Sequence, residues 1–333
     1  MDLKKLQEVF KEEPKYRLAQ AKKAIFQDLV KNWSEATVFP LAKREKLNEE
    51  LPLEIVGKTF VSKDESSERT LITLKDDLKI ETVLMQHQDR NTICVSSQVG
   101  CPLGCSFCAT GKMGFKRNLE AGEIVDQVLF YDRKLKERKE KINNIVFMGM
   151  GEPFLNYDNV MEAIRMLNDK DGFNLGARHF SISTVGIIEG IDKLAEEKLQ
   201  VNLAISLHAP TDELRSELMP INKKYPIKEV LDAVDNYIEK TNRRVMFEYV
   251  MIKGVNDSGK EARESARLMK KPLYFVNLIS YNPTGDFKPS QPLTIKRFKE
   301  VLEREGVAVT RRYRFGQEIE GACGQLAGRD IDF

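Results

Sequence analysis

The sequence lacks long apolar runs and a strong charge of either sign. No stretch approaches the ~18 apolar residues that a membrane span requires. The charged start Met1-Asp2-Leu3-Lys4-Lys5 lacks the apolar core of a signal peptide. The 53 lysines and arginines nearly balance 51 aspartates and glutamates, so the net charge of +2 indicates no particular partner. We therefore expect a cytoplasmic protein that does not associate with a membrane.

Cysteines are also few, and their number is odd. In a reducing compartment, clustered cysteines indicate a metal, iron–sulfur or redox site rather than a disulfide. Three of the five fall within eight positions of the stretch "CPLGCSFCAT" (101–110), a fourth lies just upstream and the fifth stands near the C-terminus. The cysteines are Cys94, Cys101, Cys105, Cys108 and Cys323.

Three kinds of site can include three closely spaced cysteines. Structural zinc would need four Cys or His ligands, but none of the three histidines has a ligand-pair spacing near the cluster. A ferredoxin-type cluster would need a fourth thiolate, which Cys94 or Cys323 could supply. Alternatively, three thiolates can hold three irons of a four-iron, four-sulfur (4Fe–4S) cluster. The fourth iron then stays open to an external amino and carboxylate group.

Hydrophobic periodicity predicts an α/β protein. Residues 1–50 show helical spacing, and residues 70–86 alternate on either side of an Asp-Asp turn, which indicates a hairpin. From residue 91, short β-rich runs alternate with amphipathic stretches, as in consecutive βαβ units with a parallel sheet. The predicted strands are "TICVSS" (92–97), "NIVFMGM" (144–150), "FSISTV" (180–185), "NLAISLH" (202–208), "RVMFEYVMI" (244–252) and "YFVNLISY" (274–281).

Right-handed crossovers would curl such a sheet into an open or closed barrel, with function at the carboxyl ends of its strands. The fold class expected is a partial (β/α)6 barrel with a small N-terminal helical domain and a β-hairpin extension. The expected divisions are 1–55 for the helical domain, 56–90 for the hairpin, 91–310 for the barrel and 311–333 for a C-terminal segment with Cys323.

The motif C-x3-C-x-aromatic-C, here Cys101, Cys105, Phe107 and Cys108, resembles the radical S-adenosylmethionine superfamily. Together with "FMGMGEPFLN", "AISLHAP" and "GACGQL", it is similar to the radical SAM RNA methyltransferases of the RlmN/Cfr family. The resemblance implies a 4Fe–4S cluster held by the three cysteines and two S-adenosylmethionine molecules consumed per turnover.

The resemblance also implies a two-stage methyl transfer. One S-adenosylmethionine would methylate Cys323, and a second would be cleaved to a 5′-deoxyadenosyl radical that takes hydrogen from that methyl group. The resulting methylene radical would add to carbon-2 of an adenine. Glu81 matches the family's base, and Cys94 would release the product by forming a transient disulfide with Cys323.

The reactivity of adenine agrees with a radical route, because its carbon-2 is too weak a nucleophile to attack a sulfonium directly. Cys94 and Cys323 would then need Cα atoms ~4.4–6.8 Å apart.

Polar residues at the predicted strand ends match the family's cofactor contacts. They offer carboxylate, hydroxyl and amide groups to a nucleoside sulfonium. Taken singly, each is more often an ordinary strand-end residue, and Gly-Glu-Pro is a common turn. The expected contacts are Gly151, Glu152, Ser183, Ser206, Leu207, His208 and Asn282.

Basic stretches could contact RNA. The run 133–141 is interleaved with glutamates, as expected of a solvated helix face. The run "TRRYRF" (310–315) could pair phosphates and stack on an unpaired base. The resemblance implies 23S rRNA, near the peptidyl transferase centre, and the adenosine beside the tRNA anticodon as substrates. We expect a monomer that takes electrons from a flavodoxin or ferredoxin.

Three other functions fit part of the sequence. Carbon-8 methyltransferases of the Cfr type, which confer antibiotic resistance, share all five cysteines, and Phe315-Gly316 is a feature shared with them. An electron-transfer module would explain the three close cysteines but would leave Cys323 without a role. A non-catalytic RNA-binding protein would produce no 5′-deoxyadenosine from S-adenosylmethionine.

Overall fold

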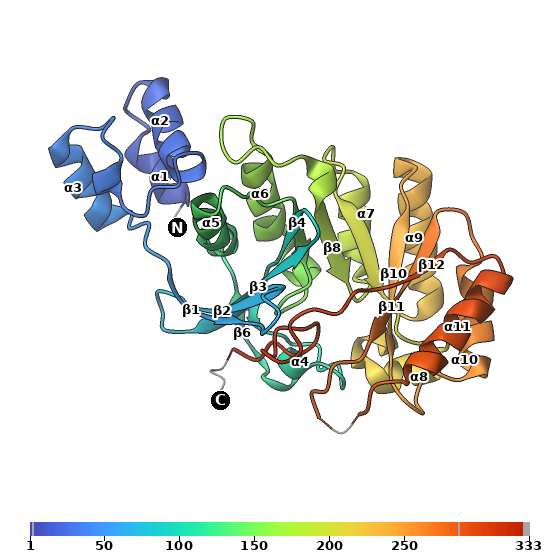
Figure 1. The fold of residues 1–333 in the computed structure, drawn as a ribbon. Coiled ribbons are helices and arrows are strands. Elements are labelled where there is room, and N and C mark those ends of the chain that lie inside the picture. The colour runs from blue at the N-terminus through green and yellow to red at the C-terminus, as the bar shows by residue number, and fades with distance from the viewer. Residues whose placement is uncertain (2, 286, 329–333) are drawn as a thin grey trace.

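The computed structural model describes residues 1, 3–285 and 287–328, and it is built on one ten-stranded mixed sheet (Figure 1). The strands lie in the order β1-β2-β3-β4-β7-β8-β9-β10-β11-β12, and β5 and β6 form a separate two-stranded sheet. The strands are β1 (Val56–Val61), β2 (Ser67–Thr73), β3 (Lys79–His87), β4 (Arg90–Cys94), β5 (Gln98–Gly100), β6 (Phe115–Asn118), β7 (Asn144–Phe147), β8 (Phe180–Thr184), β9 (Asn202–Ser206), β10 (Val245–Met251), β11 (Tyr274–Ser280) and β12 (Val309–Arg311).

Helices cover the convex side of the sheet and form a lobe near the N-terminus. None of the described helices is long and apolar enough to cross a membrane. The α-helices are α1 (Leu3–Val9), α2 (Lys15–Phe26), α3 (Leu41–Glu50), α4 (Ala109–Lys112), α5 (Ala121–Glu137), α6 (Tyr157–Asn168), α7 (Ile188–Ala195), α8 (Asp212–Leu218), α9 (Ile227–Thr241), α10 (Gly259–Met269) and α11 (Pro292–Arg304). Short 3₁₀ helices are η1 (Trp33–Glu35), η2 (Pro153–Asn156), η3 (Ala177–His179) and η4 (Pro220–Lys223).

The six predicted barrel strands are confirmed as β4 and β7–β11, each pairing in parallel with the next. Strands β10 and β11 are buried along almost their whole length, as expected where helices cover a parallel sheet that also encloses a core. The sheet stays open, because β1 and β12 are its two edges. This is the expected partial barrel. Strand β12 was not predicted, since its three residues are largely exposed and polar.

The predicted hairpin is confirmed as the antiparallel pair β2–β3, with Asp77 in the left-handed region at φ 63°. A further strand, β1, adds to its outer edge. The extension does not pack against the barrel as a separate unit, because β3 pairs antiparallel with β4 and continues the same sheet.

Helices α1–α3 confirm the periodicity of residues 1–50. The indole of Trp33 is fully buried, and its Nε1 donates to the carbonyl of Leu51 at 2.7 Å. Lys22 joins this lobe to the loop after α6 through Asp169, at 2.7 Å.

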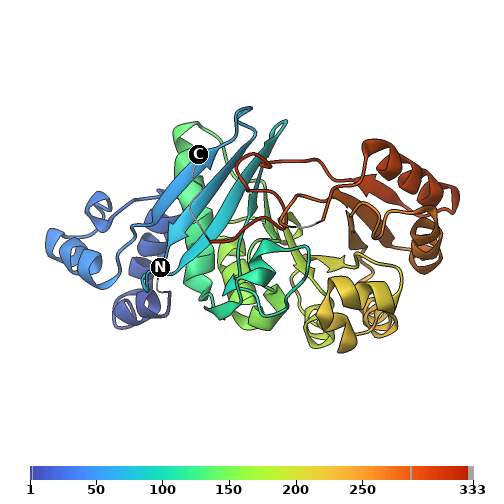
Figure 2. The same ribbon diagram turned by 90° about the horizontal axis from the view of Figure 1, so that it is seen from below.

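The C-terminal segment crosses the concave side of the sheet from β12 back to β1–β3 (Figures 1 and 2). The backbone N–H of Lys63, in the β1–β2 turn, donates to the carboxylate of Glu318. The segment therefore closes over the carboxyl ends of the strands, where the site is expected. Residues 329–333 of the predicted C-terminal unit lie outside the described part of the chain.

Candidate active site

The three clustered cysteines lie on a tight loop between β5 and α4. Gly100, the last residue of β5, has φ +75°, and a Cβ there would lie 1.8 Å from the carbonyl oxygen of Gly114, just before β6. The backbone N–H of Cys108 donates to the carbonyl of Cys105 at 3.1 Å, which turns the loop back on itself. All three cysteines line one open hollow, called here the three-cysteine hollow.

The three thiols are the predicted ligands of an iron–sulfur cluster. Among the described residues, no three His, Cys, Asp or Glu side chains converge closely enough to hold one metal ion. Burial raises the pKa of Cys101 to about 12, and that of Cys105 also rises through burial and then through the neighbouring Cys108. Both thiols are protonated at neutral pH, so a cluster must displace their protons when it binds.

Glu152 forms part of the opposite wall of the three-cysteine hollow. Gly151 approaches Gln98 so closely that a Cβ would lie 2.5 Å from the Cβ of Gln98, and its φ is +99°. The carboxylate of Glu152 accepts from the backbone N–H of Phe154 at 3.0 Å and from that of Val185 at 2.9 Å. Burial raises its pKa to about 7, against these two hydrogen bonds. Glu152 is thus a fixed, buried carboxylate that a cationic ligand would favour in its ionised form.

Most of the predicted strand-end contacts meet in this hollow, but two do not. Leu207 and Asn282 are buried and do not line it. Asn282 instead donates from Nδ2 to the carbonyl of Cys323 at 3.0 Å, so it holds the loop that bears this cysteine. The predicted contacts that line the three-cysteine hollow are Gly151, Glu152, Ser183, Ser206 and His208.

His208 is held as a neutral imidazole. Its backbone is left-handed at φ 59°, and its Nδ1 accepts from the backbone N–H of Val250 at 3.1 Å. The remaining proton therefore sits on Nε2. Burial lowers the pKa of His208 to about 3, and the positive charge of Arg215 adds to this effect. The ring contacts Phe107 edge-on, with centroids 4.9 Å apart, on the floor of the three-cysteine hollow.

Arg215 is a structural residue of the site that the sequence did not single out. It is 1% exposed, on the amphipathic helix α8, and its guanidinium donates to the carbonyls of Val185, Ser206, Leu207 and Tyr225. These bonds tie the ends of β8 and β9 together. A charged residue on a short helix gives no sign of such burial in the sequence.

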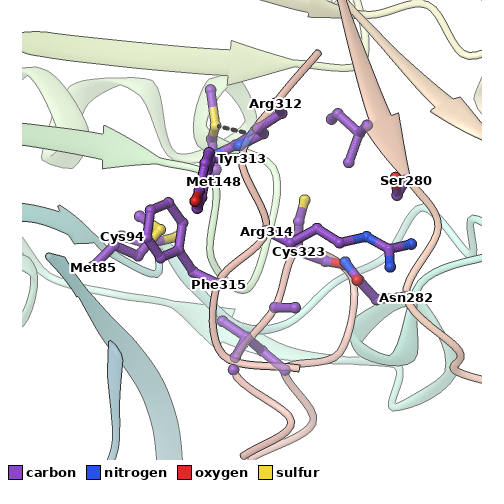
Figure 3. A pocket seen from close by; sticks show the side chains of 14 residues that line it. Met85, Cys94, Met148, Ser280, Asn282, Arg312, Tyr313, Arg314, Phe315 and Cys323 are labelled. Atoms are coloured by element: carbon purple, nitrogen blue, oxygen red, sulfur yellow. Dashed lines mark hydrogen bonds between the residues drawn. The ribbon is translucent and has the colours of Figure 1, made fainter. Parts of the chain in front are cut away.

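A second open hollow adjoins the first and is called here the Cys94 hollow (Figure 3). Cys94 lies at the end of β4, and Cys323 comes from the C-terminal segment. Cys323 lines both hollows, so this residue lies between the hollow of the three cysteines and the hollow of Cys94. The residues that line both hollows are Met148, Ile279, Arg312, Cys323 and Leu326.

The five cysteines, all within the described chain, are unpaired. Burial raises the pKa of Cys94 to about 12, and the charge of Cys323 adds to this effect, so the two thiols are electrostatically coupled. Cys323 is exposed, but the protein walls of the two hollows replace bulk water around its sulfur. This desolvation raises the pKa of Cys323, and Arg312 opposes it.

The prediction that Arg312 contacts a phosphate requires its side chain to face solvent, and the structure does not show this. Its side chain is 23% exposed and lies 3.8 Å from the buried carboxylate of Glu248. Its Nη1 points to the sulfur of Met148 at 3.3 Å (Figure 3). The prediction fails for this residue because β12 pairs with β11, and the hydrogen bond from the backbone N–H of Arg312 to the Leu278 carbonyl continues that pairing toward the barrel. Arg311 and Arg314 are exposed.

The loop that bears Cys323 is anchored to the cysteine loop. Cys323 itself is exposed. The backbone N–H of Ala109 donates to the carbonyl of Gly324 at 2.8 Å, and the hydroxyl of Thr110 donates to that of Leu326 at 2.6 Å. The site is therefore assembled from two loops far apart in sequence.

Glu81 lies on β3 and is fully buried. Its carboxylate pairs with Arg69 at 2.8 Å and accepts from the backbone N–H of Ala327 at 3.2 Å. It does not line either of the two hollows. Glu81 is therefore near the C-terminal loop but behind the surfaces that a ligand could touch in this structure.

Basic side chains of the run 133–141 bind other parts of the protein. Lys134 and Arg138 both pair with the buried carboxylate of Glu68. Arg133 donates to the carbonyl of Leu53 at 2.9 Å. These contacts leave the C-terminal segment as the better candidate for contact with RNA.

Comparison with known proteins agrees with this geometry. Residues 95–267 match the model of the radical SAM superfamily. A "Probable dual-specificity RNA methyltransferase RlmN" from Dictyoglomus turgidum is 47% identical over 316 residues, covering 94% of this chain and 91% of that protein. One from Bacillus cytotoxicus with the same name is 45% identical over 99% of this chain and 92% of its own length. The crystal structure of a radical SAM methyltransferase from Sphaerobacter thermophilus superposes with a TM-score of 0.95 at 44% identity, covering 99% of this chain and 98% of that one. The chain belongs to the radical SAM superfamily and, within it, to the RlmN family of dual-specificity RNA methyltransferases.

Proposed function

We propose that this protein methylates carbon-2 of adenosine in 23S rRNA and in tRNA, using Cys323 as a methyl relay. The observation that carries the proposal is the position of Cys323 between two hollows, one lined by Cys101, Cys105 and Cys108 and the other by Cys94. A methyl group on this sulfur can face a cofactor on one side and a nucleobase on the other. The relatives reported above bear the RlmN name, which favours carbon-2 over the carbon-8 alternative.

The three cysteines would hold a 4Fe–4S cluster, with S-adenosylmethionine beside it in the same hollow. The bound cluster supplies an electron that splits S-adenosylmethionine and gives a hydrogen-abstracting carbon radical. The carboxylate of Glu152 would accept the ammonium of the methionine moiety. The other donors toward this ligand would be the hydroxyls of Ser183 and Ser206 and the Nε2–H of His208, which line the same hollow.

Cys323 would first lose its proton and accept a methyl group from a sulfonium. Thiolates rather than thiols are the nucleophiles in such displacements. Arg312 opposes the rise in the pKa of Cys323 caused by burial, so it favours the form that reacts. Asn282 holds the carbonyl of this residue and so fixes the direction of its side chain. After hydrogen abstraction from the methyl group, the remaining methylene would bond to the base.

Cys94 and Glu81 would complete the reaction. Cys94, as a thiolate, would attack the sulfur of Cys323 and form a disulfide that an external thiol must reduce; the methylene would leave with the electron pair of its bond to sulfur and take up a proton to become the methyl group. Before this step, the adduct radical would give up one electron, and Glu81 would take the proton from carbon-2. In this structure Arg69 and the backbone of Ala327 bind its carboxylate, so Glu81 would act only after the C-terminal loop shifts.

The division of the chain follows from these roles. Residues 91–310 would form the catalytic barrel, and residues 311–333 would present Cys323 to it. Residues 1–55 would form an accessory helical domain, and residues 56–90 would form a β-hairpin extension that contributes Glu81. The protein would act as a monomer in the cytoplasm, with a flavodoxin or ferredoxin as electron donor.

Complementation tests the function directly. A strain lacking this activity would be complemented with this chain or with its Cys323→Ala variant, and adenosines from its rRNA and tRNA would be analysed by mass spectrometry. The proposal predicts 2-methyladenosine from both RNAs with the parent chain and from neither with the variant. Detection of 8-methyladenosine instead would contradict the proposed position of methylation.

A further inference from the structure

Three aromatic rings cluster where the C-terminal segment passes the tip of β3. The ring centroids of His87 and Tyr313 lie 4.5 Å apart, those of Tyr313 and Phe315 5.4 Å apart and those of His87 and Phe315 5.9 Å apart. These three residues are called here the aromatic rim. Two distant parts of the chain contribute to it, because His87 ends β3 and the other two follow β12.

The aromatic rim borders the Cys94 hollow on its open side. Tyr313 and Phe315 line the hollow together with Met85, which precedes His87 by two positions and so lies on the same face of β3 (Figure 3). Tyr313 is nevertheless 67% exposed, the highest value among the large apolar side chains of the described chain that face solvent. The rim thus forms part of the wall of the proposed site of the target base and extends from it to solvent.

Positive charge accompanies the aromatic rim. Arg314 lines the Cys94 hollow, and Arg311, which precedes it in the same segment of the chain, is exposed. Burial and then the charge of Arg311 lower the pKa of Arg314. Two cations on the segment that carries exposed rings suit a single-stranded nucleic acid, since phosphates and bases alternate along it.

We propose that the aromatic rim stacks the base that flanks the target adenosine and so keeps the RNA strand open while the target base occupies the Cys94 hollow. This inference rests on the proposed function. A base that turns out of its stack leaves its neighbour without a stacking partner, and unstacking is costly. Tyr313 would replace the lost partner, while Arg311 and Arg314 would bind the phosphates on either side.

A stacking contact beside the target adenosine would also affect which RNAs the protein accepts. Every base has an aromatic face, so stacking tolerates different sequences, whereas hydrogen bonding to base edges would not. A stacking contact next to the target would let one site accept two RNAs whose flanking nucleotides differ. The expected ligand is therefore any unpaired nucleotide adjacent to an adenosine in a loop.

Fluorescence of a modified RNA tests the proposal. The probe is a stem-loop RNA with the target adenosine in its loop and 2-aminopurine on its 5′ or its 3′ side, bound to the reconstituted protein. Stacking on an aromatic ring should quench the fluorescence of one of the two probes, and Tyr313→Phe should preserve that quenching. Tyr313→Ala should abolish it and raise the KM for RNA about tenfold, with kcat changed less than twofold. His87→Ala should act in the same direction.

Tyr16→Ala, at a 56% exposed tyrosine on the N-terminal lobe, is the matched control and should leave both measurements unchanged. A thermal unfolding midpoint within the error of the parent would show that Tyr313→Ala is folded. If the parent methylates the RNA but Tyr313→Ala shows the same KM and the same quenching, the rim has no such role. If the parent neither binds nor methylates the RNA, the proposed function fails, and the inference fails with it.

Discussion

The backbone N–H of Ala109 donates a hydrogen bond to the carbonyl of Gly324 at 2.8 Å. Each of these residues directly follows a cysteine of the site, Cys108 on one loop and Cys323 on the other. The bond therefore fixes the distance between the proposed cluster ligands and the proposed methyl acceptor. It is a main-chain contact, so substitution of the Ala109 side chain would not remove it, whereas Gly324 is held at φ +86°, where any other residue would be strained. The side chains that support it can be tested.

Asn282→Ala should weaken methyl transfer more than it weakens cofactor binding. Asn282 holds the carbonyl of Cys323 and lines the Cys94 hollow, not the three-cysteine hollow. We expect kcat for RNA methylation to fall at least tenfold, while the Kd for S-adenosylmethionine changes less than threefold. Calorimetric titration of the reconstituted variant measures the second quantity. A loss of S-adenosylmethionine affinity as large as the loss of kcat would assign Asn282 to the cofactor instead.

Arg312→Gln should make Cys94 less reactive. The positive charge of Arg312 lowers the pKa of Cys94, which burial has raised to about 12, so removing the charge raises that pKa further. At pH 8 the thiolate fraction then falls, and alkylation by iodoacetamide slows severalfold. Peptide mass spectrometry would follow the rate at Cys94. Arg312→Lys keeps the charge and should stay near the parent rate, whereas equal slowing in both variants would show that packing, not charge, is responsible.

Arg215→Met should destabilise the barrel. Arg215 is buried, and its loss leaves several backbone carbonyls at the ends of β8 and β9 without donors, each at a cost of about 1–3 kcal/mol. We expect the free energy of unfolding to fall by about 3 kcal/mol or more, measured by urea denaturation. Arg304→Met is the control, because the Arg304 side chain is 78% exposed. A difference of less than 1 kcal/mol between the two variants would contradict the structural role of Arg215.

Glu152 should make the stability of the ligand-free protein fall as pH rises. Its folded-state pKa is about 7 and its ordinary value is 4.5, so the unfolded chain loses its proton first. The contribution of Glu152 to the free energy of unfolding has its full value below about pH 4.5 and is lost as the pH rises through 7. Relative to Glu152→Gln, the parent should lose up to about 3 kcal/mol between pH 5 and pH 8. A constant difference between the two proteins over this range would show that the carboxyl titrates normally.

Much of the fold follows from local patterns in the sequence. Strands β7 to β11 are short runs of β-branched and aromatic residues separated by amphipathic helices, and both signals are local. The C-x3-C-x2-C spacing locates Cys101, Cys105 and Cys108 without any structure. Strand β12 lacks such a pattern, because its partner β11 supplies the hydrogen bonds that define it.

The arrangement around Cys323 depends on contacts that no local pattern records. Arg312 belongs to a basic run that resembles a surface, and only its pairing with Glu248 places it beside the thiols. Asn282 matched a cofactor contact by its motif, yet its amide binds the loop of Cys323. In each case a long-range partner determines where the side chain points, so the sequence predicts the residue but not its role.

Isotope labelling tests the methyl relay most directly. The protein would be supplied with S-adenosylmethionine whose methyl group carries three deuteriums, and the methylated adenosine would be analysed by mass spectrometry. Passage through a methylene on Cys323 removes one deuterium, so the account predicts a product methyl group with two deuteriums and the third deuterium in 5′-deoxyadenosine. A product that retains all three deuteriums would mean that the methyl group moved intact, and it would contradict the account.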